Sequence, residues 1–139
     1  MVFAGRTLSS EGANARFDTM LRTVEEVPFA KQPVVERGSG EILGYAGVAW
    51  FDFEGRRRLE FGYRLVPWAR GLGYATEAGH ALLRLAAQTF EGELLAMIDP
   101  VNMASKRVAG KLGFEFWKVA TVNGDRDEIH RIQVAKDQT

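Results

Sequence analysis

An arginine and two glycines stand together at residues 70–75 (RGLGYA), directly before a segment whose apolar spacing predicts a helix. A helix start exposes unpaired backbone N–H groups and the positive end of the helix dipole. Glycine also lets the backbone approach a ligand closely. The segment therefore indicates an anion cradle that suits a phosphate or a pyrophosphate. The alternative is that Gly71 and Gly73 only make a tight strand-to-helix turn.

The spacing of these glycines excludes two common phosphate loops. A dinucleotide-binding fingerprint needs a third glycine three residues after Gly73, where this chain has Thr76. A P-loop needs a Gly-Lys-Ser/Thr sequence, which does not follow here. If the loop binds an anion, it therefore does so neither as a dinucleotide-binding fingerprint nor as a P-loop.

The pattern along the rest of the chain predicts one mixed sheet with helices around it. The middle of the chain favours a three-strand antiparallel meander, and the segments after the loop alternate between helix and strand. Expected helices lie at residues 9–23, 74–90 and 103–112; expected strands lie at 34–35, 42–51, 57–66, 94–98, 114–122 and 129–135. In the helix at 103–112 we expect an inner stripe of Ala104, Val108 and Leu112, with Gly113 ending the helix.

Composition narrows the class of protein. The 139 residues suit a single domain. The 18 basic and 18 acidic residues give zero formal charge, which disfavours nucleic acids and anionic membranes as partners. The absence of cysteine excludes disulfides, thiolate metal sites and a cysteine nucleophile, and two histidines, His80 and His130, do not suggest a metal site. We find no membrane span and no secretory signal, so we expect a cytoplasmic protein.

Two sequence blocks resemble the GNAT superfamily of N-acetyltransferases. The pattern Arg70-x-x-Gly73-x-Ala75 is similar to the acetyl-CoA signature of that family, and residues 60–65 (EFGYRL) precede it as the family's context would. A second block follows, with NxxS at residues 102–105 and KLGF at 111–114. Both blocks together resemble the RimJ/RimL-like branch, which acetylates ribosomal proteins, over residues 34–122.

This resemblance implies a fold and a cofactor. The fold is an α/β (α+β) one, with a mostly antiparallel central sheet flanked by helices and a V-shaped splay between the two central strands, which we associate with a bulge near Pro67. The cofactor is acetyl-CoA. The resemblance implies that the backbone of Leu65 and Val66 and the side chain of Asn102 bind the pantetheine arm, and that Ser105 lies near the thiol. The pyrophosphate would be bound by the charge of Arg70 and by backbone N–H groups of the glycine loop, those of Gly71, Leu72, Gly73, Tyr74 and Ala75.

The chemistry of acetyl transfer adds catalytic candidates. An amine acceptor must lose a proton before it attacks a thioester, and Glu60 is the candidate base, acting directly or through a water. The alternative is an exposed strand carboxylate paired with an arginine. The Val66 N–H is the candidate donor to the tetrahedral intermediate.

The leaving thiolate also needs a proton donor. Many family members carry a tyrosine on the second helix, and this chain has none between Val101 and Gly113, so Ser105 or a water must serve. The alternative for Ser105 is to cap the helix, which Asn102 could also do.

Only a few residues precede Gly5, so the family's first strand looks missing or reduced to a stub. The strand at 34–35 would then lie at the edge of the sheet, and a partner subunit could cover it, so we expect a homodimer.

The most complete hypothesis is an acetyl-CoA-dependent N-acetyltransferase. It would transfer acetyl directly to a primary amine, either a protein N-terminus or a small amine, in a ternary complex without a covalent enzyme intermediate. Two alternatives remain: a non-catalytic acyl-CoA-binding regulatory or structural protein, and a binder of another nucleotide phosphate.

Overall fold

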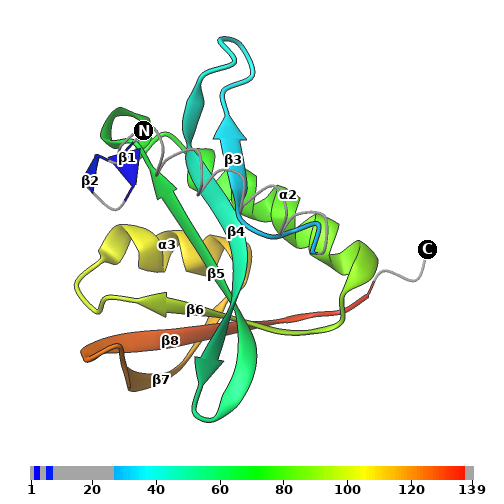
Figure 1. The fold of residues 1–139 in the computed structure, drawn as a ribbon, viewed down its shortest axis with the longest axis vertical. Helices are drawn as coiled ribbons and strands as arrows, with labels where there is room; N and C mark the ends of the chain where they lie inside the picture. Colours follow the sequence, from blue (N-terminus) through cyan, green and yellow to red (C-terminus); the bar gives the residue numbers. More distant parts are fainter. Residues whose placement is uncertain (1, 4–5, 8–26, 137–139) are drawn as a thin grey trace.

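The computed structural model describes residues 2–3, 6–7 and 27–136, which form one sheet with two long helices and a small separate strand pair (Figure 1). The helix expected at 9–23 lies outside the described residues. The elements are β1 (Val2–Phe3), β2 (Arg6–Thr7), β3 (Gln32–Val35), β4 (Ile42–Phe53), β5 (Arg56–Leu65), the 3₁₀ turn η1 (Pro67–Ala69), α2 (Tyr74–Thr89), β6 (Gly92–Ile98), α3 (Met103–Leu112), β7 (Glu115–Val122) and β8 (Asp125–Val134).

The main sheet has six strands in the order β3-β4-β5-β6-β8-β7. Every neighbouring pair is antiparallel except β5 with β6, so the expected fold class is confirmed. Two tight turns set the hairpins, because Glu54-Gly55 and Asn123-Gly124 all have positive φ, as a two-residue turn between twisted strands requires. Among the described strands β3 is an outer one, and β1 pairs with β2 as a separate two-stranded sheet.

The two central strands, β5 and β6, are paired at only two positions. β5 and β6 are joined at Leu59 with Leu94 and at Glu60 with Leu95, and the ladder ends there. Figure 1 shows the two strands diverging from this point, with α3 lying behind the opening. The V-shaped splay is therefore confirmed.

The cause that we predicted for the splay is wrong. The β4–β5 register runs from Gly44 opposite Leu65 to Phe53 opposite Arg56 without a shift, so β5 carries no bulge near Pro67. Pro67 instead starts the 3₁₀ turn, where its fixed φ suits a first helical position. The β5–β6 pairing ends at Glu60, which is seven residues before Pro67.

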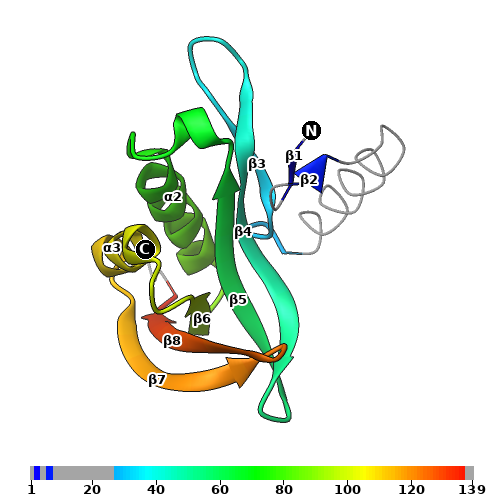
Figure 2. The ribbon, with the colours of Figure 1, turned by 90° about the vertical axis from the view of Figure 1, so that its left-hand side faces the viewer.

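Both long helices cover one face of the sheet (Figure 2). Their inner residues, which include Leu82, Ala86, Ala109 and Leu112, pack on the main core with Leu94 of β6. The expected stripe of α3 is partly wrong, because Ala104 is exposed and lines a groove described below. Gly113 ends α3 in the left-handed conformation, as predicted.

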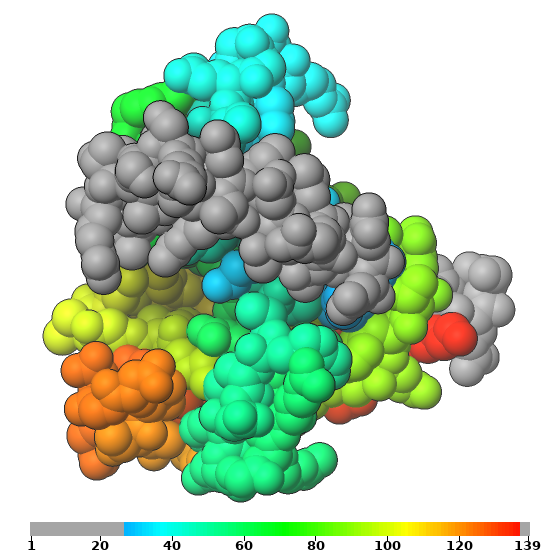
Figure 3. Space-filling view, in the orientation of Figure 1, coloured from blue at the N-terminus to red at the C-terminus, as the bar shows by residue number. Residues whose placement is uncertain are grey.

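A smaller core lies on the opposite face, since neighbouring residues of a strand alternate between faces. Leu95 and Ile129 are fully buried there and pack with Phe53. The Phe53 ring meets the Trp117 ring edge-on at 6.2 Å between centroids, which joins the β4–β5 hairpin to the β7–β8 pair. Figure 3 shows these two pairs of strands side by side on this face. In the described part of the chain, no helix combines the length and the apolar composition needed to cross a membrane.

A short segment before β3 lies directly against the backbone of β4. The Lys31 N–H donates to the Val48 carbonyl, and the Val48 N–H donates to the Phe29 carbonyl, both at 3.1 Å. This close approach needs a residue without a side chain at Gly47, where φ is +143° and an added Cβ would lie 2.4 to 2.6 Å from the backbone of Ala30 and Lys31. Gly47 therefore fixes the position of Lys31.

We predict that Gly47→Ala lowers the free energy of unfolding by about 3 kcal/mol. The new Cβ would clash with the backbone of Ala30 and Lys31, and alanine is strained at this positive φ. Gly62 is the matched control, since it lies directly opposite Gly47 on β5 and an added Cβ there meets no atom within 4 Å. Urea denaturation of both alanine variants measures the difference. Equal stability of the two variants would contradict the assignment.

Candidate functional site

A groove of about 680 Å³ runs between the end of β5, the start of α2 and one side of α3. Most of the residues predicted to bind acetyl-CoA line it. These are Leu65, Arg70, Gly71, Gly73, Tyr74, Ala75, Asn102 and Ser105; the groove is completed by Tyr63, Arg64, Thr76, Ala104, Arg107, Val108 and Lys111.

The glycine loop forms an open cradle at the start of α2. Gly73 is the N-cap residue with φ +87°, in the left-handed region that favours glycine, and no side chain caps the first turn of the helix. An added Cβ at Gly71 or Gly73 would meet no protein atom within 4 Å, so the space beside both is open. The Tyr74 hydroxyl donates to Glu36 Oε2 at 2.8 Å and ties the start of α2 to the β3–β4 turn. Backbone N–H groups therefore face an open space, as an anion site requires.

The charge around the groove suits a polyphosphate. Among the described residues that line it, four are basic and none is acidic, the basic ones being Arg64, Arg70, Arg107 and Lys111. Arg70 also has a structural contact, because its Nε donates to the Leu65 carbonyl at 3.0 Å and so fixes the loop to the end of β5. The sequence analysis did not name Arg64, Arg107 or Lys111 as binding residues, although Arg64 and Lys111 lie within the two sequence blocks that carry the resemblance.

Two predicted binding residues, Val66 and Leu72, are not among the described residues that line the groove. The Val66 N–H donates to the Leu43 carbonyl at 2.8 Å, so it belongs to the β4–β5 ladder. This corrects its predicted role as the donor to the reacting carbonyl. The Leu72 side chain is 63% exposed; the role of its backbone N–H stays a prediction.

The register indicates which backbone groups take the place of Val66. In an antiparallel pair, alternate residues of a strand direct their backbone groups to the partner strand. Because Val66 bonds to β4, the N–H groups of Tyr63 and Leu65 are directed away from β4, into the opening between β5 and β6. The prediction was thus wrong by one residue, because the N–H group of Leu65, not that of Val66, is directed into the opening.

The first turn of α3 brings two hydroxyl groups together. Asn102 Oδ1 accepts a hydrogen bond from the Ser105 N–H at 3.1 Å, so Asn102 is the capping residue. The Ser105 side chain is then available for another contact, and its Oγ lies 3.2 Å from the Tyr63 hydroxyl. Sequence reasoning missed Tyr63, although its alternation with Leu65 along β5 would place it on the same face as that groove residue.

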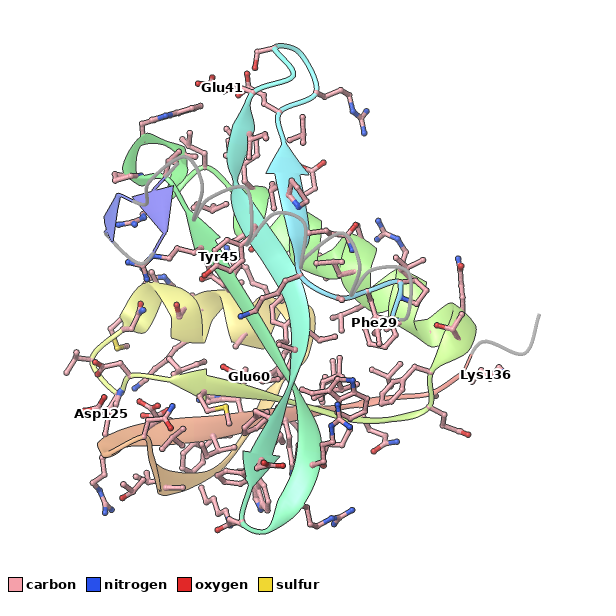
Figure 4. All side chains as sticks on the ribbon, in the orientation of Figure 1. Phe29, Glu41, Tyr45, Glu60, Asp125 and Lys136 are labelled. Carbon is pink, nitrogen blue, oxygen red and sulfur yellow. The ribbon has the colours of Figure 1, made fainter. Side chains whose placement is uncertain are left out.

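A second, smaller cavity of about 210 Å³ lies beside the opening, and Glu60 lines it with Lys31 and Tyr45 (Figure 4). The Lys31 Nζ lies 5.5 Å from the centre of the Tyr45 ring. Burial raises the pKa of the half-buried Glu60 carboxyl above its ordinary value; Lys31 opposes this shift and Asp127 adds to it. A carboxylate with a raised pKa is a better proton acceptor than a surface one.

The two cavities meet at the splay. Of the described residues, Tyr63, Ser105 and Val108 line both of them. Glu60 and Tyr63 are three residues apart on β5, so their side chains leave the strand on opposite faces. The arrangement can therefore bind a polyphosphate compound on the helix side and hold a proton acceptor on the other side of the opening.

We predict that Asn102→Ala lowers the free energy of unfolding by about 1 kcal/mol, because the first turn of α3 loses its side-chain cap. Val101→Ala is the control, since Val101 is 82% exposed and should stay within about 0.5 kcal/mol of the wild type. Thermal denaturation of the two variants compares them. If Asn102→Ala loses no more stability than Val101→Ala, the cap adds nothing measurable to the stability of the fold.

Comparisons with known proteins agree with this geometry. A family model described as an acetyltransferase (GNAT) domain matches residues 1–115. The uncharacterized protein YkkB of Bacillus subtilis (strain 168) is 37% identical over 84 residues, which make up 60% of this chain and 49% of YkkB. The chain thus spans about half the length of this curated relative.

Solved structures share the fold at low sequence identity. A putative GnaT-family acetyltransferase from Bordetella pertussis is 22% identical with a TM-score of 0.78, and the match covers 92% of this chain and 80% of that one. The putative acetyltransferase yncA from Salmonella typhimurium, solved with acetyl-CoA, is 19% identical with a TM-score of 0.68, over 99% and 81%. The ribosomal-protein-S5-alanine acetyltransferase from Vibrio fischeri is 20% identical with a TM-score of 0.72, over 92% and 76%. With the family model covering most of its length and its groove fitted to a polyphosphate, the chain belongs to the GNAT acetyltransferase family, whose acetyl donor is acetyl-CoA.

Proposed function

We propose that this protein transfers the acetyl group of acetyl-CoA directly to a primary amine, with both substrates bound at once. The observation that carries the proposal is the junction of the two cavities, because it sets a basic groove and a carboxylate on opposite sides of one opening. Acetyl-CoA supplies an activated acyl group on sulfur. The absence of cysteine from the sequence favours direct transfer over a cysteine-bound intermediate.

Glu60 is the proposed base. An amine reaches the site mostly as an ammonium ion, which cannot attack a carbonyl carbon until it loses a proton. The Glu60 carboxylate accepts that proton, directly or through a water, and the raised pKa makes it a stronger base. The N–H groups of Tyr63 and Leu65 face the opening and are the proposed donors to the oxygen that becomes negative during the attack.

The acceptor is either a protein N-terminus or a small amine. The structural neighbours include an acetyltransferase for a ribosomal protein, the S5-alanine enzyme named above, and one for a small molecule, the aminoglycoside acetyltransferase AAC(6')-Ib. Both are below 25% identical, so the assignment to the RimJ/RimL-like branch stays a proposal that rests on the two sequence blocks. The homodimer also stays a proposal, supported by the outer position of β3 among the described strands.

A panel of amines, with detection of released thiol, tests the activity. We expect the protein to release CoA from acetyl-CoA only when a suitable amine is present, and to acetylate that amine as seen by mass spectrometry. The panel contains peptides with free N-termini, polyamines and an aminoglycoside. A protein that is stabilised thermally by CoA but releases no thiol with any acceptor would instead be a binding protein. Stabilisation by ATP or NAD and not by CoA would contradict the proposal altogether.

We predict that Glu60→Gln slows single-turnover transfer by about 100-fold and leaves the affinity for acetyl-CoA unchanged, because the amide cannot accept the proton. Glu91→Gln is the control, since Glu91 is an exposed carboxylate between α2 and β6 and should leave the rate unchanged. An unchanged rate in the Glu60 variant would remove this residue from the mechanism.

The same variant has a predicted effect on stability. Burial raises the Glu60 pKa, so protonated Glu60 adds to the free energy of unfolding in acid. This contribution is lost as the pH rises through the raised pKa of the folded protein. At neutral pH the folded protein therefore holds a charged group at a cost. We expect Glu60→Gln to raise the melting temperature at neutral pH and to lose this advantage in acid, which thermal denaturation at two pH values measures.

A further inference from the structure

We propose that the acceptor is a small amine that also carries a carboxylate, and that Lys31 binds this carboxylate while Glu60 receives the amino group. The inference rests on the acetyltransferase function proposed above and names the class of acceptor for the same site. In it Lys31 determines specificity and takes no part in the transfer of protons. Amino acids are the simplest compounds of this class.

The first argument is the charge of the cavity that holds Glu60. Of the described residues around its volume of about 210 Å³, only Lys31 and Glu60 are charged, so the cavity has one charge of each sign. A compound with one ammonium group and one carboxylate would place each of its charges beside an opposite one. A diamine would instead bring a second positive charge towards Lys31, which is unfavourable.

The second argument is that the Lys31 ammonium has no anionic partner among the described residues. The ion pairs of that part of the chain involve Glu54, Glu93 and Glu128, and none of them includes Lys31. The contact that Lys31 does make is with the Tyr45 ring, whose centre lies 5.5 Å from Nζ. An ammonium group has three N–H donors, and a contact with a ring face leaves donors for a carboxylate.

The third argument is the relation between the two charged side chains. The charge of Lys31 lowers the pKa of the Glu60 carboxyl, against the larger effect of burial, so the two groups lie close enough to interact. No ion pair joins them, although both line the same cavity. The cavity therefore has space for a small molecule between a cation and a carboxylate.

One further acid gives the bound acceptor a direction. Asp127 of β8 raises the pKa of the Glu60 carboxyl, but it does not line the cavity. The negative charges of Asp127 and Glu60 attract the amino group of the acceptor and repel its carboxylate. The amino group is therefore favoured at Glu60 and the carboxylate at Lys31.

The backbone around Lys31 is fixed by contacts that do not use its ammonium. The Lys31 N–H donates to the Val48 carbonyl at 3.1 Å. Gln32 Nε2 donates to the carbonyls of Pro28 and Ala30, both at 3.0 Å, and so closes the turn before β3. A bound carboxylate then needs to order the lysine side chain alone, which keeps the entropic cost of binding small.

Pairs of amines that differ only in the carboxylate test the inference. The pairs are glycine, β-alanine, 4-aminobutyrate and several larger α-amino acids, each with its own amide. They vary the distance between the two groups and the size of the molecule. With saturating acetyl-CoA, we expect the wild type to use at least one of these acids with a kcat/KM about 10- to 100-fold above that of its amide.

Variants of Lys31 show whether this residue causes the preference. Lys31→Met should abolish it, and Lys31→Arg should keep most of it, because arginine retains the charge. Comparing the ratio of acid to amide in the wild type and in each variant cancels the difference in basicity between the two amines. The affinity for acetyl-CoA should change by less than about twofold, since Lys31 does not line the groove.

Lys136→Met is the matched control. Lys136 is exposed after the end of β8 and lines neither cavity, so its variant should keep the ratio of the wild type. A Lys31 that only adjusts the pKa of Glu60 would change the rates with acid and amide equally. An equal change of both rates in Lys31→Met would therefore overturn the inference.

A measurement without turnover gives independent support. The protein with bound CoA has no acetyl group to transfer, so calorimetric titration with the preferred amino acid reports binding alone. We expect the Kd to rise about 10- to 100-fold in Lys31→Met and to stay unchanged in Lys136→Met. An unchanged Kd in Lys31→Met would contradict the assigned contact. If Lys31→Met fails to fold, Lys31→Gln takes its place in both experiments.

The wild type alone can also overturn the inference. It would do so by acetylating polyamines, peptides or the amides at least as well as every one of the amino acids. In that case the acetyltransferase function stands, because thiol is released with another amine. A wild type that releases no thiol with any amine would contradict the proposed function, and the inference with it.

Discussion

The parting of β5 from β6 directly after Glu60 is the constraint on which the rest of the molecule depends. A strand inside a sheet normally satisfies its backbone groups on both sides, and an unpaired buried group is costly. Here β5 continues beyond Glu60 with a partner on the β4 side only. The opening is kept by what surrounds it: β5 is held by the continuous β4 ladder, β6 is held by β8, and α3 lies behind the gap. The fold thus directs backbone N–H groups of β5 into the opening, where the proposed function needs them.

The opening also separates two kinds of electrostatic environment. On the helix side, the start of α2 and the basic side chains of Arg70, Arg107 and Lys111 favour negative charge. On the other side, burial disfavours the charge on Glu60, and Lys31 offsets part of that cost from a backbone position that Gly47 permits. The site therefore combines groups that stabilise the protein, such as the Asn102 cap, with a carboxylate that costs stability when it is ionised.

The sequence predicted most of the fold, because hydrophobic alternation and turn residues are local signals. The helix at 103–112 has the predicted bounds, and the glycine loop begins α2 as expected. The strand register and the cause of the splay between β5 and β6 were harder to predict. Proline suggested a bulge, but the end of the β5–β6 ladder is decided by tertiary contacts that no local pattern carries. The shift from Val66 to Leu65 reflects the phase of strand pairing, and the Tyr63–Ser105 contact joins residues 42 positions apart, which a single sequence does not reveal.

The alternation of side chains along β5 limits the insertions that this part of the chain can accept without moving a side chain to the other face. Glu60 and Tyr63 stand on opposite faces because an odd number of steps separates them. A one-residue insertion between them would move one of the two across the sheet, even if every strand still formed and the core adapted. A two-residue insertion would restore the faces but would lengthen the path across the opening by about one strand repeat, roughly 7 Å. The three-residue interval between Glu60 and Tyr63 therefore fixes both the face that each side chain occupies and the distance between the two groups across the opening.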